Sequence, residues 1–352
     1  MEEKKKTARE IIEGYDGPPV RIMEVCGTHT HEIFRLGIRK LLPEQVELIS
    51  GPGCPVCVTQ VGFIDEAIYL ALERQVTICT FGDLVRVPGT NMSLAGARER
   101  GAKIRIVYSP VDAKEYAKEH PKEQVTFLSV GFETTTPSAC LSVKKAREEG
   151  LTNYSILTAN KTMPQAYEAL KGSADIFLYP GHVNAITGTK LCEELAKEGV
   201  SGVVAGFTAK ELLTALAVAL VRFQEGRPFF ANCYPRVVTE NGSPQAQKLV
   251  EEMMEPCDSE WRGLGVIKGS GMRLQEEWSA FDARKKYKIP PIQGKANPAC
   301  RCGDVLQGKC KPSDCKVFGK VCTPQHPVGA CMVSGEGACS AYYMYGEAEK
   351  MK

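Results

Sequence analysis

Short apolar segments alternate with helix-like segments along most of this chain, and that alternation limits the folds open to it. The apolar segments are rich in the β-branched and aliphatic residues that fill buried strands. The expected strands cover residues 20–25, 46–49, 76–81, 103–108, 125–130, 155–158, 176–179 and 202–207. Helix-like stretches between them, and residues 209–223 after the last, provide the crossovers that parallel strands need. The sequence therefore predicts an α/β fold with parallel sheets.

The expected strands divide into two consecutive groups of four, so we expect two tandem Rossmann-like α/β domains. The first would span residues 16–120 and the second residues 121–228. From about residue 229 the periodicity weakens, and cysteine, proline and glycine become frequent. Residues 229–352, with or without the charged helix expected at 1–15, are therefore predicted to form a third, cysteine-rich domain.

The composition is that of a soluble globular protein. Hydrophobic residues make up 43% of the chain, charged residues 24%, and the formal net charge is +2. This charge gives no reason to expect nucleic acid as a partner, and no apolar run reaches the length of a membrane span. Residues 1–10 are charged and lack the apolar core of a secretory signal. We therefore expect a cytoplasmic protein whose 15 cysteines serve metal binding or thiol chemistry rather than a disulfide framework.

Unusual loops directly follow several expected strands. They carry Cys26, the pair Cys54 and Cys57, Glu133, and His182. In open α/β sheets, ligands bind beyond the carboxyl ends of the strands, so these loops are candidate site segments. If the two halves face each other, the loops would line one cleft.

The segment 51–57 reads G-P-G-C-P-V-C and places the thiols of Cys54 and Cys57 three positions apart. A C-x-x-C pair can exchange a disulfide, hold a metal or close a structural bridge. The proline inside the pair resembles thioredoxin-type sites and favours redox chemistry. Two buried thiols can also pack simply as small apolar groups. The residues alone leave these alternatives open.

Cysteines are concentrated near the C-terminus. Seven of the 15 lie there: Cys300, Cys302, Cys310, Cys315, Cys322, Cys331 and Cys339. The surrounding segment has too little apolar periodicity to form a core unaided, so a bound metal is expected to supply part of its folding free energy. Zinc and an iron–sulfur cluster both accept four thiolates, but zinc sites usually contain short C-x-x-C pairs that are absent here.

The motifs of this chain resemble those of the HypD family of [NiFe]-hydrogenase maturation factors. The matching segments are C-G-T-H at 26–29, G-P-G-C-P-V-C at 51–57, G-F-E-T-T at 131–135 and P-G-H-V at 180–183. Asn184 is a departure, because serine is expected after the last of them. The resemblance covers nearly the whole chain. It implies two related α/β domains followed by a domain with an iron–sulfur cluster.

The spacing of four C-terminal cysteines is also similar to that of the family. It reads C-x14-C-x6-C-x16-C, the family's pattern for a [4Fe-4S] cluster, and its members are Cys300, Cys315, Cys322 and Cys339. Three further thiols fall outside it: Cys302, Cys310 and Cys331.

The resemblance implies a scaffold on which an iron atom acquires two cyanides and one carbon monoxide. The family acts with a small chaperone, HypC, and receives cyanide groups from HypE. The finished Fe(CN)2CO group then passes to the hydrogenase large subunit. This chain is thus expected to be a redox-active assembly scaffold rather than a conventional enzyme.

Under this resemblance each site residue has an expected role. Cys26 is the expected iron ligand, because a soft thiolate suits low-valent iron. His29 would orient or deprotonate that thiol, or cap the following helix. Cys54 and Cys57 would supply two electrons by forming a disulfide, or one of them would ligate iron. Glu133 and His182 are expected to handle protons or contact a partner. The loop of Glu133 could equally serve to cap the next helix.

Two functions from other classes compete with the scaffold. A thiol–disulfide oxidoreductase with a structural metal domain would use the Cys54–Cys57 pair alone. A passive binding protein held together by a cluster would not need that pair. Replacing Cys54 or Cys57 distinguishes it from the other two functions, because only the passive binder should keep full activity.

Overall fold

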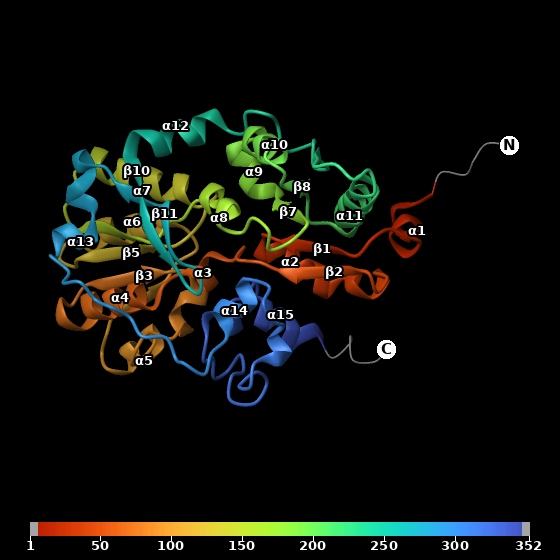
Figure 1. Cartoon of the computed structure of the whole chain (residues 1–352). Helices are drawn as coiled ribbons and strands as arrows, with labels where there is room; N and C mark the ends of the chain where they lie inside the picture. Colours follow the sequence, from red (N-terminus) through yellow and green to blue (C-terminus); the bar gives the residue numbers. More distant parts are fainter. Residues whose placement is uncertain (1–5, 347–352) are drawn as a thin grey trace.

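A computed structural model describes residues 6–346 of the chain. Two parallel sheets lie side by side, and the C-terminal segment packs below β2 and α3 in the view of Figure 1. The first sheet, in the order β2-β1-β7-β8-β9, comprises β1 (Val20–Glu24), β2 (Val46–Ser50), β7 (Ile176–Pro180), β8 (Ser201–Ala205) and β9 (Phe230–Asn232). The second, in the order β4-β3-β5-β6, comprises β3 (Thr77–Thr80), β4 (Ile104–Ile106), β5 (Val125–Ser129) and β6 (Tyr154–Thr158). All pairings in both sheets are parallel, which confirms the predicted fold class.

The expected assignment of four consecutive strands to each sheet is wrong. β1 pairs with β2 on one side and with β7 on the other, whereas β3 and β4 join β5 and β6 in the second sheet. The chain therefore leaves the first sheet after β2 and returns to it at β7. Local apolar patterns identify strands but not their partners, so periodicity carried no information on this exchange.

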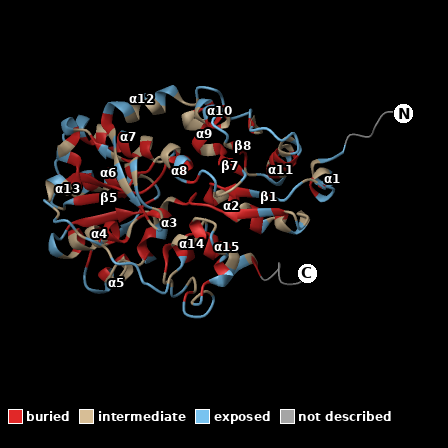
Figure 2. Cartoon of the chain, in the orientation of Figure 1, coloured by how far each residue is buried: buried red, intermediate tan, exposed pale blue. Residues whose placement is uncertain are grey.

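Helices cover the sheets, and their bounds are α1 (Ala8–Glu13), α2 (Gly27–Arg35), α3 (Pro55–Val58), α4 (Val61–Glu73), α5 (Leu94–Glu99), α6 (Pro110–Glu119), α7 (Thr136–Glu148), α8 (Met163–Ala169), α9 (Gly181–Thr187), α10 (Lys190–Lys197), α11 (Ala209–Phe223) and α12 (Pro244–Met253). Among these, α11 has the predicted bounds. Its start is fixed by a capping box in which Thr208 and Glu211 each bond the other's backbone N–H. Figure 2 shows that the strands are buried while the outer helix faces are exposed. No helix within residues 6–346 is long and apolar enough to cross a membrane.

A β-hairpin follows α12, where the sequence suggested only a glycine-rich stretch. Its strands are β10 (Met254–Trp261) and β11 (Gly265–Leu274), and they pair antiparallel. The turn between them uses Gly263 and Gly265 at positive φ. Trp261 is fully buried and stacks on Phe132, so the hairpin anchors to the loop after β5.

The cysteine-rich segment is built from short helices joined by turns. After η3 (Glu276–Phe281) and α13 (Ala283–Lys286) come α14 (Cys302–Leu306), η4 (Pro312–Asp314), η5 (Ala330–Met332) and α15 (Ala338–Tyr345). The segment packs on α2, where the rings of Phe34 and Tyr342 lie 4.7 Å apart. The N-terminal helix α1 instead packs beside α11 (Figure 1).

Candidate functional site

Two cysteine-bearing loops meet at the carboxyl edge of the first sheet. β1 and β2 are neighbours with Glu24 opposite Ser50, so the loops that follow them emerge side by side. The amide of Gly27 donates to the carbonyl of Gly53 at 3.0 Å. A Cβ at position 53 would lie 2.1 Å from the backbone nitrogen of Cys26, so only glycine allows this approach.

The thiols of Cys54 and Cys57 are paired within one helical turn. Cys54 is the N-cap of α3, and its sulfur accepts from the Cys57 amide at 3.3 Å. The two sulfur atoms are 2.7 Å apart, and both side chains are buried. Forming the bond between them requires only a small approach of the sulfurs. The predicted pair is therefore placed to form a disulfide within itself.

Cys26 is also buried, beside the C-terminal segment. Burial raises the pKa of Cys26 to about 12, and hydrogen bonding from the backbone of His29 partly offsets this. Thr28 donates to the Glu336 carboxylate at 2.6 Å, and a Cβ at position 27 would lie 2.7 Å from the Glu336 Cβ. The Cys26 loop is thus wedged between the C-P-V-C turn and the loop before α15. A metal bound by this thiol must displace its proton.

The imidazole of His29 does not serve the Cys26 thiol in this structure. Its Nε2 lies 3.2 Å from the Ala205 carbonyl and 3.1 Å from that of Gly206, so Nε2 carries the proton. Burial, with a smaller contribution from the nearby His182, lowers the pKa of His29 to about 3. His29 is therefore a neutral side chain that ties the start of α2 to the loop after β8.

His182 lies near His29 but is separated from it by an aromatic ring. The Phe207 ring stacks on His182 at 5.1 Å and packs against His29 at 4.9 Å. Burial lowers the pKa of His182 to about 4. The structure thus brings the two predicted histidines together as neutral rings around Phe207.

Glu133 comes from the second sheet, in the loop between β5 and α7. Its Oε1 accepts from the Met163 amide at 2.8 Å, while Oε2 is enclosed by protein and has no hydrogen-bond partner among the described residues. Burial raises the pKa of Glu133 to about 7. Burial raises the pKa of Tyr167 as well, and Cys192, Glu133, Tyr179 and Cys26 add to that increase. The charges of both predicted groups, Glu133 and Cys26, thus act on the Tyr167 hydroxyl.

The four cysteines of the long spacing line one small apolar pocket. Its walls also carry Cys302 and Cys331, and the quartet consists of Cys300, Cys315, Cys322 and Cys339. The Val328 amide donates to the Cys322 sulfur at 3.3 Å, a contact of the kind that stabilises cluster thiolates. Within residues 6–346 no three cysteine, histidine or acidic side chains converge as ligands of a single metal ion. Four thiols spread around a common space suit a multi-atom cluster.

Cys331 and Cys302 connect this pocket to the C-P-V-C pair. The sulfurs of Cys302 and Cys331 are 2.9 Å apart, and both residues are buried. Burial raises the pKa of Cys57, and hydrogen bonding to Cys331 adds to the increase. The Cys331 thiol is therefore close to Cys57 and contacts Cys302. A continuous series of thiols runs from Cys54 to the quartet.

Sequence reasoning missed two residues of this region, Tyr167 and Glu336, and assigned no role to Cys302 or Cys331. Cys302 follows Cys300 after one residue, so the C-x-C spacing was a usable signal. Tyr167 and Glu336 are brought in by tertiary packing, and no local pattern marked them. Cys310 lies outside the quartet pocket.

Comparison with known proteins gives consistent matches over nearly the whole chain. The family model HypD, described as "Hydrogenase formation hypA family", matches residues 2–346. The chain is 42% identical to hydrogenase maturation factor HypD of Cupriavidus necator over 347 residues, covering 95% of this chain and 92% of that protein. It is 43% identical to the Escherichia coli protein of the same name over 339 residues, with 94% and 90% covered. The Rhodobacter capsulatus protein is 44% identical over 340 residues, with 94% and 90% covered.

Proposed function

Because the chain belongs to the HypD family of hydrogenase maturation factors, we propose that it is the scaffold on which the Fe(CN)2CO group is assembled. Its partners would be a HypC-type small chaperone and a HypE-type cyanide donor. The observation that carries this proposal is the convergence of Cys26, the Cys54–Cys57 pair and the C-terminal thiols at one edge of the first sheet. Iron is the substrate in this proposal.

Cys26 is the proposed ligand of the substrate iron. Its thiol is buried, so a bound iron would be protected from water. Backbone N–H groups of the following helical turn lower the pKa of Cys26 relative to burial alone, and so favour the thiolate that soft metal ions prefer. Glu133 is a candidate acceptor of the proton that leaves this thiol. Its pKa of about 7 allows both the protonated and the ionised carboxyl to be present at neutral pH.

Cys54 and Cys57 are the proposed local electron source. When both thiols join in a disulfide, the S–S bond forms, two electrons pass to the substrate iron site and two protons are released. The Cys331 and Cys302 thiols extend the pair toward the quartet. The residues that would hold a [4Fe-4S] cluster are Cys300, Cys315, Cys322 and Cys339, and the cluster would supply one-electron reducing equivalents.

A thiol–disulfide oxidoreductase is the second candidate function. The 2.7 Å separation of the Cys54 and Cys57 sulfurs favours it. Burial of both thiols opposes it, since a protein disulfide must reach the attacking sulfur.

All 15 cysteines are unpaired, as in a reducing compartment, and assembly is therefore proposed to take place in the cytoplasm.

Infrared spectroscopy of the protein purified anaerobically with its small partner tests the proposal. The wild-type complex should show cyanide and carbonyl stretches. Cys26→Ala should abolish them while the C-terminal iron and sulfide remain. Cys54→Ala should retain some iron but fail to mature hydrogenase. Cys233→Ala, which removes a half-buried thiol that belongs to none of these groups, is the matched control.

Two outcomes would contradict these assignments. If Cys26→Ala keeps the bands and Cys57→Ala loses them, the ligand and the redox thiols are exchanged. If the active wild-type complex lacks the bands and Cys54→Ala loses only disulfide reductase activity, the oxidoreductase is the better description.

A further inference from the structure

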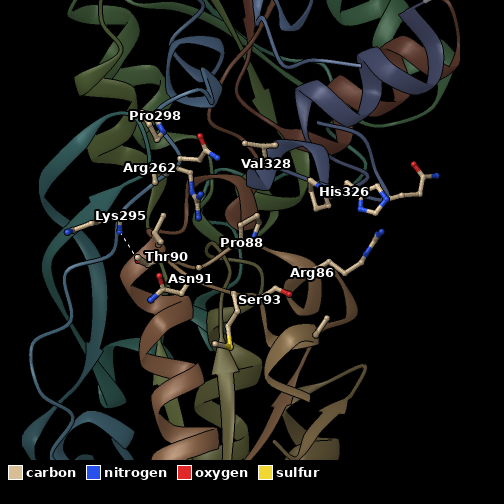
Figure 3. Close-up of a pocket in the computed structure, with 18 residues that line it drawn as sticks. Arg86, Pro88, Thr90, Asn91, Ser93, Arg262, Lys295, Pro298, His326 and Val328 are labelled. Atoms are coloured by element: carbon tan, nitrogen blue, oxygen red, sulfur yellow. Dashed lines mark hydrogen bonds between the residues drawn. The ribbon is translucent and has the colours of Figure 1, made fainter. Parts of the chain in front are cut away.

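A cavity of about 780 Å³ lies outside the site described above. Figure 3 shows that it is walled by the loop before α5, the turn of the β10–β11 hairpin, the extended segment before α14 and the loop after Cys322. These segments are distant in sequence, with Thr90 and Lys295 joined by a hydrogen bond of 2.8 Å from the Lys295 amide to the Thr90 hydroxyl. The cavity therefore exists only in the complete fold, and its size suits a small organic ligand.

The lining of this cavity is basic. It carries Arg86, Arg262, Lys295 and His326, and none of its 18 residues, all within the described chain, is Asp or Glu. The carboxylate of Asp65 lies behind the wall, where it accepts from the amide and the hydroxyl of Thr90. A concave surface lined by one sign of charge concentrates its field and attracts the opposite ion.

Arg262 is held in place on one wall of the cavity. Its amide donates to the Val58 carbonyl at 2.9 Å, and its Nε donates to the Thr59 carbonyl at 2.9 Å. Its Nη2 is enclosed and has no acceptor among the described residues. In Figure 3 the guanidinium points into the space above Thr90. A guanidinium that is held by Nε and keeps Nη2 without a protein acceptor is suited to carboxylate and phosphate groups.

We propose that this cavity binds a small molecule carrying phosphate or carboxylate groups. Arg262 would contact one oxyanion, and Arg86 and His326 on the opposite wall would contact a second. The asparagine and serine side chains of the lining would supply neutral hydrogen bonds, in particular Asn91, Ser93 and Asn297.

The site would couple two thiol-bearing parts of the molecule. Arg262 is bonded to the residues that end α3, the helix of Cys54 and Cys57. Val328, on the facing wall, donates to the Cys322 sulfur. A ligand that bridges these walls would therefore restrain α3 relative to the cysteine-rich segment. Binding at this cavity would not depend on which metal the C-terminal thiols hold.

Titration calorimetry of the full chain, purified anaerobically with its native iron, tests the proposal. The probes are inorganic phosphate, pyrophosphate and citrate at low ionic strength. At least one multivalent probe should bind with one site per chain, weaken as salt is added, and slow amide exchange in residues 86–95 and 325–328. If pyrophosphate binds and citrate does not, the site recognises phosphate groups. If citrate binds and pyrophosphate does not, it recognises carboxylate groups.

Two variants and one control decide the result. Arg262→Gln should weaken probe binding by about tenfold or more, as expected for loss of a charged hydrogen-bonding partner. Arg86→Gln combined with His326→Gln should do the same without removing the bond from Arg262 Nε to the Thr59 carbonyl, so it keeps the test valid if Arg262→Gln is unstable. Lys268→Gln, at an exposed position of β11, should change nothing. No binding of any probe, binding that both variants retain in full, or binding of an acidic peptide alone would overturn the proposal.

Discussion

Glu133 is the site residue whose charge can be tested most directly. Burial raises the pKa of Glu133 to about 7, above its ordinary value of 4.5. A raised carboxyl pKa contributes stability that is fully present below about pH 4.5 and is lost as the pH rises through 7. Glu133→Gln removes the charge and keeps an acceptor for the Met163 amide. The variant should be more stable than wild type by roughly 1–3 kcal/mol at pH 8.5 and close to it at pH 5, measured by urea unfolding.

Glu277→Gln is a suitable control, because Glu277 is exposed and pairs with Arg147 on the surface. It should show little difference at either pH. A loss of stability at pH 8.5 in Glu133→Gln would mean that the folded protein holds this carboxyl as an ion, contrary to the expected direction.

The predictable residues of the site are those that lie in the chain directly after a strand. Cys26, Cys54 and Cys57 were found because strand ends of parallel sheets gather ligands, and the structure brings them together as expected. Cys331 and Glu336 reach the same place from the opposite end of the chain. Contacts across some 300 residues depend on packing, which no local pattern records.

At the scale of elements, the contact between the two cysteine loops depends on Gly53. A Cβ there would lie 2.1 Å from the Cys26 nitrogen and 2.3 Å from its Cα, and backbone atoms cannot yield as a flexible side chain does. Gly53→Ala should therefore cost about 2–4 kcal/mol in unfolding free energy or displace the Cys26 loop. Thermal unfolding measures the first effect, and loss of the cyanide and carbonyl bands reports the second.

Gly96→Ala provides the matched comparison within a helix. Position 96 lies in α5, and the added Cβ would meet the Met92 Cβ at 3.4 Å, an ordinary contact. This variant should be neutral or more stable by up to about 1 kcal/mol, because alanine favours helix. Equal effects of the two substitutions would show that the approach of the loops is not tightly constrained.

We expect the C-terminal helices and turns to depend on their thiols. Anaerobically purified protein should contain about four irons and four sulfides per chain, and Cys315→Ala or Cys322→Ala should lose both and expose the segment to proteolysis. Cys257→Ala, in the hairpin, should keep the iron. Stoichiometric zinc without sulfide, in protein made with a working cluster-assembly system, would contradict the cluster.

At the scale of the whole molecule, the cysteine-rich segment supports the helix that begins beside Cys26. Besides the Phe34–Tyr342 contact, His31 lies 2.9 Å from the Gly335 carbonyl through Nδ1, and Thr28 bonds Glu336. Removing metal with a chelator should therefore increase amide exchange in α2 as well as in α15. Exchange in α11, which packs between α1 and the first sheet, should change much less. Unchanged exchange in α2 would show that the two parts are independent.

The sequence was sufficient for the fold class, for most helix and strand positions and for the cysteine-rich segment, because each depends on local periodicity or composition. It was not sufficient for the strand partners. The chain leaves the first sheet after β2 and returns to it at β7. The hairpin of β10 and β11 places Trp261 and Arg262 against the end of α3, the helix of Cys54 and Cys57. Both features are set by long-range packing, and both shape the site.

The pairing of β1 with β7 also constrains how the protein is made. Ile22 lies opposite Ile176, so β1 can pair with β2 early but must wait for its second neighbour until about 150 more residues have been made. At about 5–20 residues per second that delay is roughly 10–30 s. The quartet and Glu336 follow later still. A nascent chain therefore holds Cys26 and the C-P-V-C turn without the surroundings that bury them, and the thiol site becomes enclosed only after residues 300–339 have been made.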